Sequence, residues 1–496
     1  MNAKIKLTAL MLLLALFTSI QPANAQTIEF NTLASFDNTN GTAPVAALTL
    51  GPDSNLYGTT YFGGTSNFGT IFRLTPGGTL TTLLSFSNTS GPALGAYPAG
   101  ALAVGLDGNF YSTTLLGGTN GAGTVFQLTT NGGFTSLASF NSLGGPRAVE
   151  AILGDTNATN TNGGEPFAAL ALAADGSFYG TTVYGGSNGV GTVFHVTTNG
   201  TLTSLCSFAG LASNGGTNAS GAKPLNGLTF LTVGDLYGLT SYGGSDGVGT
   251  IFQMATNGAL TSLYSFSKGT DNEDGVYTNA DGAEPIENSL TLGLDGNFYG
   301  EASYGGITGS GTIFKLTTNG VLNPIFTFDA QIPDGKAYTN MTGASPNGLT
   351  PGPDGRFYGT TSSAGTNGVG TVFSINTNGT FKLLYSFRPL VRGTNASGAE
   401  PSQLTLGPDG NLYGTTFAGG IYGYGTVFQV ILPPVLKIQY IAGSAVLTWS
   451  NTAFSLESAT RLDGSYSPVL GAYSNRYTNA VTSGNQFFRL GIVKSF

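Results

Sequence analysis

The chain of 496 residues contains a single histidine, His195, which limits the chemistry that its side chains can perform. A Ser-His-Asp or Cys-His arrangement needs a histidine beside the nucleophile, and a multi-histidine metal centre needs at least a second one. At the position of His195, the other copies of an internal repeat described below hold Arg73, Gln127, Gln253, Lys315, Ser374 and Gln429. A position that accepts all of these types is expected to face solvent from a β-strand. We therefore assign no catalytic role to His195.

The single cysteine, Cys206, is expected to be an inert packing residue. At its position the other repeats hold Leu84, Ala138, Tyr264, Phe326 and Tyr385. A buried thiol among such residues behaves as a small hydrophobic side chain. One cysteine also excludes an intramolecular disulfide, so stability must come from burial and hydrogen bonding.

Carboxylates are the next candidates for chemistry. Aspartates recur at one point of every regular repeat, at Asp53, Asp107, Asp175, Asp295, Asp354 and Asp409. Paired carboxylates can act in acid–base catalysis. A residue that returns in each unit is better explained by turn chemistry, because aspartate favours tight turns. We therefore predict no catalytic residue in this set.

A second acidic group lies in the sequence Asp271-Asn272-Glu273-Asp274-Gly275, with Asp281 downstream. Several oxygen ligands on one loop suit a hard cation. Asp271, Asp274 and Asp281 are the ligands of this candidate calcium site, and calcium is the one cofactor that we consider. The spacing of an EF-hand loop is not met, because Thr270 occupies its first position. The alternative is a solvated acidic loop without metal.

Composition excludes several classes of partner. Charged residues make up only 8% of the chain, the net charge is −8, and no basic stripe is present, so we expect binding neither to nucleic acid nor to anionic lipid. Glycine accounts for 78 residues, while 40% of the chain is apolar. This apolar content is too high for a disordered chain, so the glycines indicate many tight turns.

The N-terminus has the pattern of a signal peptide, assigned to residues 1–25. Lys4 and Lys6 precede an apolar stretch at 7–17, and Ala23-Asn24-Ala25 is an A-x-A cleavage signal. The apolar stretch is shorter than the roughly 20 residues that a membrane span needs. We therefore expect cleavage between Ala25 and Gln26 and a secreted or cell-surface protein without a transmembrane segment in the mature chain.

One unit recurs seven times and decides the architecture. Its first copy spans 48–86, and further copies begin near Leu102, Leu170, Leu228, Leu290, Leu349 and Leu404. Each reads as four short strands, here named A to D, with an Asp-Gly or Asp-Ser turn between A and B that we expect to be type I′. Paired glycines between strands B and C are bends and not phosphate loops, since no helix follows them. Four antiparallel strands per unit predict a blade of a β-propeller.

The ends of the repeat region predict ring closure. Six copies end in a D strand at Phe86, Phe140, Phe208, Phe266, Phe328 and Phe387, but no D strand follows the seventh copy. A matching segment, Leu33-Ala34-Ser35-Phe36, precedes the first copy. We predict an all-β, seven-bladed propeller over 26–432 in which this N-terminal strand completes the last blade. Closure would remove the exposed sheet edges of an open array.

The repeat resembles the Gloeo-Verruco (GloVer) repeat of secreted bacterial proteins. The resemblance is carried by Pro401, the run DGNLYGTT at 409–416, Gly419-Gly420 and the run GYGTVF at 423–428. It covers roughly 28–430. The resemblance implies export and a repeat fold, and it brings no catalytic motif with it.

The segment 435–496 has a different character and follows Pro433-Pro434. It reads as about five short strands and holds Trp449, the only tryptophan. Its closing run FFRL at 487–490 resembles the small fibronectin-like module at the end of many secreted Verrucomicrobia-type proteins. We expect a small β-sandwich-like domain here.

The expected binding face follows from the topology. A–B and C–D turns lie on one rim of a propeller, whereas B–C and D–A connections lie on the other. Only the D–A connections vary widely in length, which marks their rim as the functional one. The same rim carries aromatic residues before the glycine pairs, Phe62, Tyr184, Tyr242 and Tyr304, which suit stacking on sugar rings. The alternative is that these aromatics pack between blades.

Three functions remain open from the sequence. The first is an exported, non-enzymatic binding scaffold for glycan or a surface protein. The second is a propeller enzyme of the lactonase or polysaccharide-lyase type, which would need an asymmetric cluster of ionisable residues at one end of the channel. The third is a structural component of the envelope or matrix. Fold alone does not choose between them.

Overall fold

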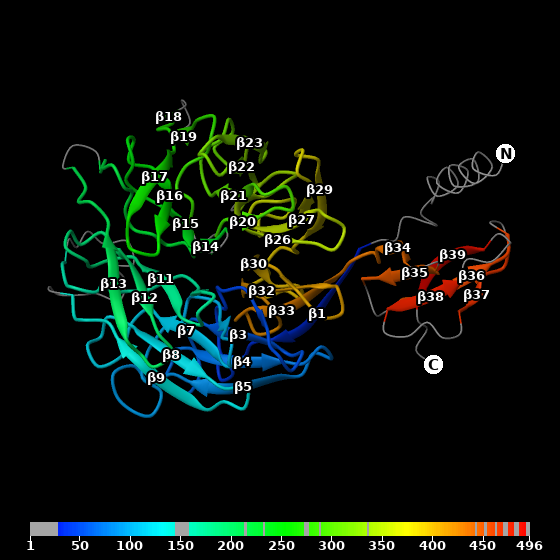
Figure 1. Ribbon diagram of the computed structural model, residues 1–496, viewed down its shortest axis with the longest axis horizontal. Coiled ribbons are helices and arrows are strands. Elements are labelled where there is room, and N and C mark those ends of the chain that lie inside the picture. Colours follow the sequence, from blue (N-terminus) through cyan, green and yellow to red (C-terminus); the bar gives the residue numbers. More distant parts are fainter. Residues whose placement is uncertain are drawn as a thin grey trace.

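The computed structural model describes residues 28–496 except for 144–157, 213–215, 232–233, 272–276, 287–288, 335–336, 442–443, 451–453, 462–463, 470–474, 481–485 and 493–496. The predicted signal peptide lies outside the described residues. Within them all regular structure is β-strand, and no helix long and apolar enough to cross a membrane is found. The sheets follow one another around a ring (Figure 1).

Six sheets each contain four antiparallel strands in chain order. The first three are β2 (Thr49–Leu50), β3 (Leu56–Thr60), β4 (Thr70–Leu74) and β5 (Leu80–Ser85); β6 (Ala103–Val104), β7 (Phe110–Thr114), β8 (Thr124–Leu128) and β9 (Phe134–Ser139); and β10 (Ala171–Leu172), β11 (Phe178–Thr182), β12 (Thr192–Val196) and β13 (Leu202–Ser207). The next three are β14 (Thr229–Phe230), β15 (Asp235–Thr240), β16 (Thr250–Ala255) and β17 (Leu260–Ser265); β20 (Thr291–Leu292), β21 (Phe298–Ala302), β22 (Thr312–Leu316) and β23 (Leu322–Thr327); and β26 (Ala344–Pro351), β27 (Phe357–Ser363), β28 (Thr371–Ile375) and β29 (Phe381–Ser386). These sheets are the blades predicted from the repeat.

The seventh sheet combines the two ends of the repeat region. It contains β30 (Ala399–Pro401), β31 (Thr405–Leu406), β32 (Leu412–Ala418), β33 (Thr426–Ile431) and, as its outer strand, β1 (Glu29–Ser35). β1 runs antiparallel to β33, with Ala34 opposite Val427 and Ser35 opposite Thr426. The prediction that the N-terminal strand completes the last blade is therefore confirmed (Figure 1).

The A–B turn differs from its predicted type. In the first blade the amide of Ser54 donates to the carbonyl of Gly51 at 3.0 Å, and the amide of Gly51 donates to the carbonyl of Asn55 at 2.8 Å. Only the residue after the aspartate has positive φ, 63° at Ser54 and 76° at Gly108 in the second blade. A type I′ turn requires positive φ at both central residues, so the type I′ prediction was wrong. The aspartate itself keeps ordinary backbone geometry, and its side chain is therefore free to hold the turn.

Neighbouring blades are joined by aromatic packing and by a strained residue before a proline. Tyr57 of the first blade lies 4.3 Å from Phe110 of the second, between ring centroids, inside a fully buried cluster. The residue before the proline that leads into each blade has φ between 47° and 59°, at Ala43, Tyr97, Glu165, Lys223, Glu284, Ser345 and Glu400. Such a conformation is costly for residues other than glycine. Its return at all seven junctions shows that blade-to-blade packing imposes it.

Beyond the ring, two three-stranded sheets face each other (Figure 1). One contains β34 (Leu436–Ile441), β35 (Ser444–Trp449) and β38 (Arg476–Ala480), and the other β37 (Ser467–Pro468), β36 (Phe454–Ala459) and β39 (Phe487–Ile492). Leu447 and Trp449 of the first sheet pack against Phe454 and Leu456 of the second. The indole Nε1 of Trp449 donates to the carbonyl of Phe454 at 2.9 Å. This is the sandwich-like arrangement expected for the C-terminal segment.

Two small hairpins lie in the D–A connections. They are formed by β18 (Thr270–Asp271) with β19 (Tyr277–Thr278), and by β24 (Ile332–Asp334) with β25 (Ala337–Thr339). Isolated bridges such as Gly164 with Tyr184 and Ala283 with Tyr304 bring the D–A segments beside the B–C loops. The two kinds of connection therefore share one rim, as the topology predicts.

Candidate functional site

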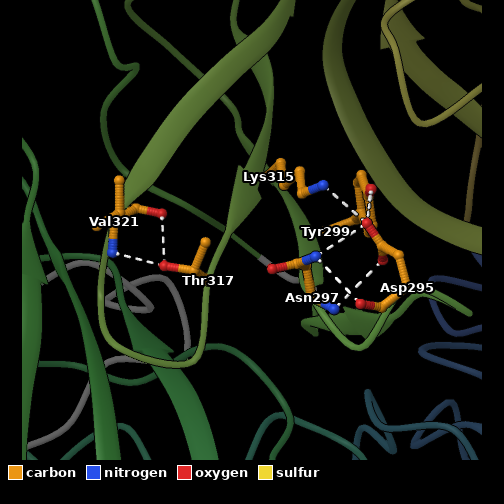
Figure 2. A network of polar contacts seen from close by, with 6 residues as sticks. All are labelled: Asp295, Asn297, Tyr299, Lys315, Thr317 and Val321. Atoms are coloured by element: carbon orange, nitrogen blue, oxygen red, sulfur yellow. Dashed lines mark hydrogen bonds and ion pairs between the residues drawn. The ribbon is translucent and has the colours of Figure 1, made fainter.

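The repeated aspartates of the A–B rim are part of a polar network that the sequence analysis missed. In the fifth blade Oδ2 of Asp295 accepts hydrogen bonds from Asn297 Nδ2 at 2.9 Å, Tyr299 OH at 3.0 Å and Lys315 Nζ at 2.7 Å (Figure 2). Burial alone raises the pKa of the Asp295 carboxyl, but the bonds from Lys315 and Asn297 outweigh it and hold this pKa well below its usual range. The carboxylate is thus an ionised acceptor that ties strand B to strand C.

The same network returns around the ring. Tyr57 donates to Asp53 at 2.8 Å and Tyr111 to Asp107 at 2.8 Å. In the irregular fourth blade, Gln253 Nε2 donates to Asp235 at 2.9 Å. These bonds tie the aspartates to their own blades, which is the arrangement that a role in turn chemistry requires.

His195 lies beside this network. It is half-buried, stands opposite Tyr179 in the strand register, and its ring centroid is 4.9 Å from that of Tyr179. The side chain at this point of strand C is partly exposed to solvent and also covers the tyrosine of strand B. Gln127 and Gln429 use the same position to reach their aspartates.

Cys206 packs against the cluster between the third and fourth blades and is half-buried. Burial raises the pKa of its thiol, which keeps it in the unreactive, protonated form. The predicted packing position is confirmed, although the side chain is less buried than expected.

Of the three candidate calcium ligands, only the side chain of Asp281 lies within the described residues. Asp274 and the side chain of Asp271 lie outside them. Asp281 is 5% exposed, and its Oδ2 accepts from Tyr264 OH at 2.8 Å and the Ser267 amide at 2.9 Å, while Oδ1 accepts from Ser267 Oγ. No group of three acidic, histidine or cysteine residues suited to a metal occurs among the described residues. Asp281 instead closes the base of its loop.

The four aromatic residues predicted to contact ligand have different environments. Tyr184 is only 3% exposed, and Lys223 Nζ lies 5.4 Å from its ring centroid and 5.3 Å from that of Tyr242. Phe62 packs edge-on against Tyr61, with centroids 4.7 Å apart. Tyr304 alone is well exposed, at 48%.

Exposed apolar side chains gather on one sector of the predicted functional rim. Among the described residues of its B–C and D–A connections, every exposed large hydrophobic side chain comes from the fifth, sixth or seventh blade. We call this set the rim surface: Tyr277, Tyr304, Ile307, Ile332, Tyr338, Met341, Val391, Phe417, Ile421, Tyr422 and Tyr424. The loop of the seventh blade contributes four of them within 417–424. Its sequence, GGIYGYG, departs from the Ser, Thr and Asn of the sister loops and could have revealed the sector.

The centre of the ring holds a cavity of about 80 Å³. All seven blades line it, with apolar side chains such as Val45, Phe167 and Leu225 and the polar side chains of Asn347 and Gln403. No ionisable side chain of the described residues lines this cavity.

The sequence profile of the Gloeobacter/Verrucomicrobia repeat matches residues 17–159 and 154–350. The chain belongs to the Gloeobacter/Verrucomicrobia repeat family. The match confirms the resemblance read from the repeat units, and it names no activity. No curated protein matches this member of the family.

Several solved structures resemble this Gloeobacter/Verrucomicrobia repeat protein weakly. A Bacteroides uniformis protein described as a 6-phosphogluconolactonase shares 16% identity, with a TM-score of 0.42 over 88% of this chain and 100% of the other. A Bacteroides fragilis protein of the same description shares 16% identity, with a TM-score of 0.43 over 88% and 98%. A Thermus thermophilus oxidoreductase described as a glucose dehydrogenase shares 15% identity, with a TM-score of 0.35 over 82% and 100%. The propeller architecture of the repeat protein rests on its own sheets.

Proposed function

We propose that this Gloeobacter/Verrucomicrobia repeat protein is an exported, non-enzymatic scaffold that binds glycan through its rim surface. The observation that carries the proposal is that, among the described residues of the B–C and D–A connections, every exposed large hydrophobic side chain comes from the fifth, sixth or seventh blade. A regular repeat would distribute such residues evenly if they served only folding. Exposed apolar patches on soluble proteins mark interaction sites.

The chemistry of the seventh blade favours glycan over other partners. Phe417, Tyr422 and Tyr424 are 40%, 55% and 41% exposed, and glycines separate them. Aromatic faces accept the apolar faces of sugar rings, while tyrosine hydroxyls can bond to sugar hydroxyls. Tyr304 adds a further exposed ring in the fifth blade. Contacts spread over three blades suit a polymeric ligand, because several weak contacts then act together.

The described lining of the central cavity does not favour the enzyme alternative. Acid–base catalysis needs a positioned ionisable group. The described residues that line the central cavity offer hydroxyl and amide groups, such as Ser402 and Gln403, and apolar side chains. The lactonase and dehydrogenase descriptions belong to structures too distant to transfer an activity.

A binding screen tests the proposal. The chain from Gln26 onward would be incubated with insoluble cellulose, chitin and xylan, and in parallel with a lactone and with a uronic-acid polysaccharide to detect turnover. Retention on at least one polysaccharide, without turnover of either substrate, is expected. Turnover of the lactone or cleavage of the polysaccharide would overturn the non-enzymatic assignment, and capture of proteins without polysaccharide retention would replace glycan by protein as the partner.

A further inference from the structure

Glu301 breaks the pattern of the repeat at the junction between the fifth and sixth blades. It lies in β21, is 1% exposed, and neither carboxyl oxygen has a hydrogen-bond partner among the described residues. At this point of strand B the other blades hold Thr59, Thr113, Thr181, Leu239, Thr360 and Thr415. A buried carboxyl without partners is costly when charged, so its presence requires an explanation.

The sister residues show what this position does. Thr181 Oγ1 donates to the carbonyl of Asn226 in the next blade at 3.1 Å. Thr360 Oγ1 likewise donates to the carbonyl of Ser402 at 2.9 Å. At the same position Thr59 and Thr113 have no hydrogen-bond partner among the described residues, and Leu239 has no polar atom, so the position accommodates a donor toward the following blade without requiring one. A carboxylate has no proton to donate, whereas a neutral carboxyl has one.

The adjoining strand of the sixth blade is irregular beside Glu301. β26 contains a bulge between Asn347 and Leu349, and the bulged Gly348 has a φ of 62°. A Cβ at this position would lie 2.4 Å from Cδ of Gln403, so a side chain there would displace Gln403 and would also strain the backbone at positive φ. The amide of Gly348 is the polar group that opposes the effect of burial on Glu301, but it forms no hydrogen bond with either carboxyl oxygen.

Among the described residues, no charged side chain compensates the carboxyl. β20 and β26 carry no titratable residue. Tyr299 of the same strand and Lys315 of β22 both bond to Asp295, and Tyr358 of β27 bonds to Asp354. Glu284, on the segment before β20, is itself shifted upward in pKa by burial. Burial likewise raises the pKa of Glu301 to about 8, and the Gly348 amide offsets this only in part.

We propose that Glu301 is a proton-dependent latch between the fifth and sixth blades, neutral while the ring is closed and opening the junction when it loses its proton. The ordinary pKa of glutamate is about 4.3 in an unfolded chain, so between pH 4.3 and 8 the folded ring holds a proton that the unfolded chain releases. The contribution of protonated Glu301 to the free energy of unfolding is fully present below about pH 4.3. This contribution is lost as pH rises through the folded pKa of about 8. The proposed latch concerns ring closure and does not depend on what the rim surface binds.

The chain supplies its own control residues. Glu301→Thr and Glu301→Leu reproduce the residues of sister blades, and Glu301→Gln keeps the shape without the charge. We expect the folding equilibrium constant of the wild type to fall by at most tenfold per pH unit between pH 5 and 8, relative to these variants. The measurement is chemical denaturation at each pH. Equal pH dependence in wild type and any folded variant would overturn the latch.

Two measurements on the wild type need no variant. The infrared carbonyl band of a protonated carboxylic acid should be present at pH 7 and lost by pH 10. Amide exchange in β21 and β26, corrected for intrinsic rates, should accelerate between pH 6 and 9 relative to β11, whose junction holds Thr181. Absence of the band at pH 7, or equal acceleration at the two junctions, would contradict the proposal.

Discussion

The hydroxyl of Tyr299 donates to Oδ2 of Asp295 across the A–B turn of the fifth blade at 3.0 Å, and the phenol is fully buried. The same pair occurs as Tyr358 with Asp354 and as Tyr413 with Asp409. Each pair links the A–B turn of a blade to strand B, which packs against the next blade. The repeat therefore carries its stabilising network within the unit.

Tyr299→Phe should destabilise the ring by about 1–2 kcal/mol, since it removes a hydrogen bond to a charged acceptor while keeping the packing. Urea denaturation of the purified protein gives the change in free energy of unfolding. Tyr179→Phe is the matched control, because the hydroxyl of Tyr179 makes no hydrogen bond to Asp175 in the described contacts. A cost as large for Tyr179→Phe as for Tyr299→Phe would refute the role of the network.

Acid should weaken the ring through these aspartates. Hydrogen bonds from neighbouring side chains hold the pKa values of Asp53, Asp107 and Asp295 below the ordinary value, despite burial. Their contribution is present above about pH 4 and is lost as pH falls through the lowered folded pKa values. Stability measured from pH 6 to pH 2 should decline, and Asp295→Asn should flatten part of that decline. An unchanged slope in the variant would exclude Asp295 as a contributor.

Phe36 tests the closure of the ring. It is fully buried, and it packs with Leu48 and Phe72 of the first blade, as Phe86 packs with Phe110 of the second. Phe36→Ala should therefore cost as much as Phe86→Ala, about 3–5 kcal/mol by thermal or chemical unfolding. A much smaller cost for Phe36→Ala would mean that the N-terminal strand is dispensable.

Export can be measured directly. Expression of the full chain in a bacterial host, followed by mass spectrometry of the exported fraction, should give a mature N-terminus at Gln26. Replacement of Ala25 by a bulky residue should prevent cleavage, so that the unprocessed chain accumulates. Recovery of intact Met1 in the soluble cytosolic fraction would contradict the assignment.

The strands and the ring closure could be predicted because they depend on local alternation and on the register of a repeated unit. Exposure could not. Tyr184 and Tyr304 stand in the same sequence context, before a glycine pair, yet Tyr184 packs with Leu143 and Leu225 whereas Tyr304 is 48% exposed. Such cover comes from D–A connections of irregular length. Glu301 was missed for a related reason, since its environment is set by a bulge in the neighbouring blade.

The central claim, that the rim surface binds glycan, is tested most directly by paired variants. Phe417→Ala/Tyr422→Ala/Tyr424→Ala removes three exposed rings from the rim surface, while Leu106→Ala/Leu294→Ala/Val321→Ala removes exposed apolar side chains from the opposite rim. At about 0.5–1.5 kcal/mol per aromatic contact, the first variant should bind the retained polysaccharide at least tenfold more weakly in depletion isotherms. The second should bind like the wild type. Equal affinity of the folded first variant and the wild type would contradict the account.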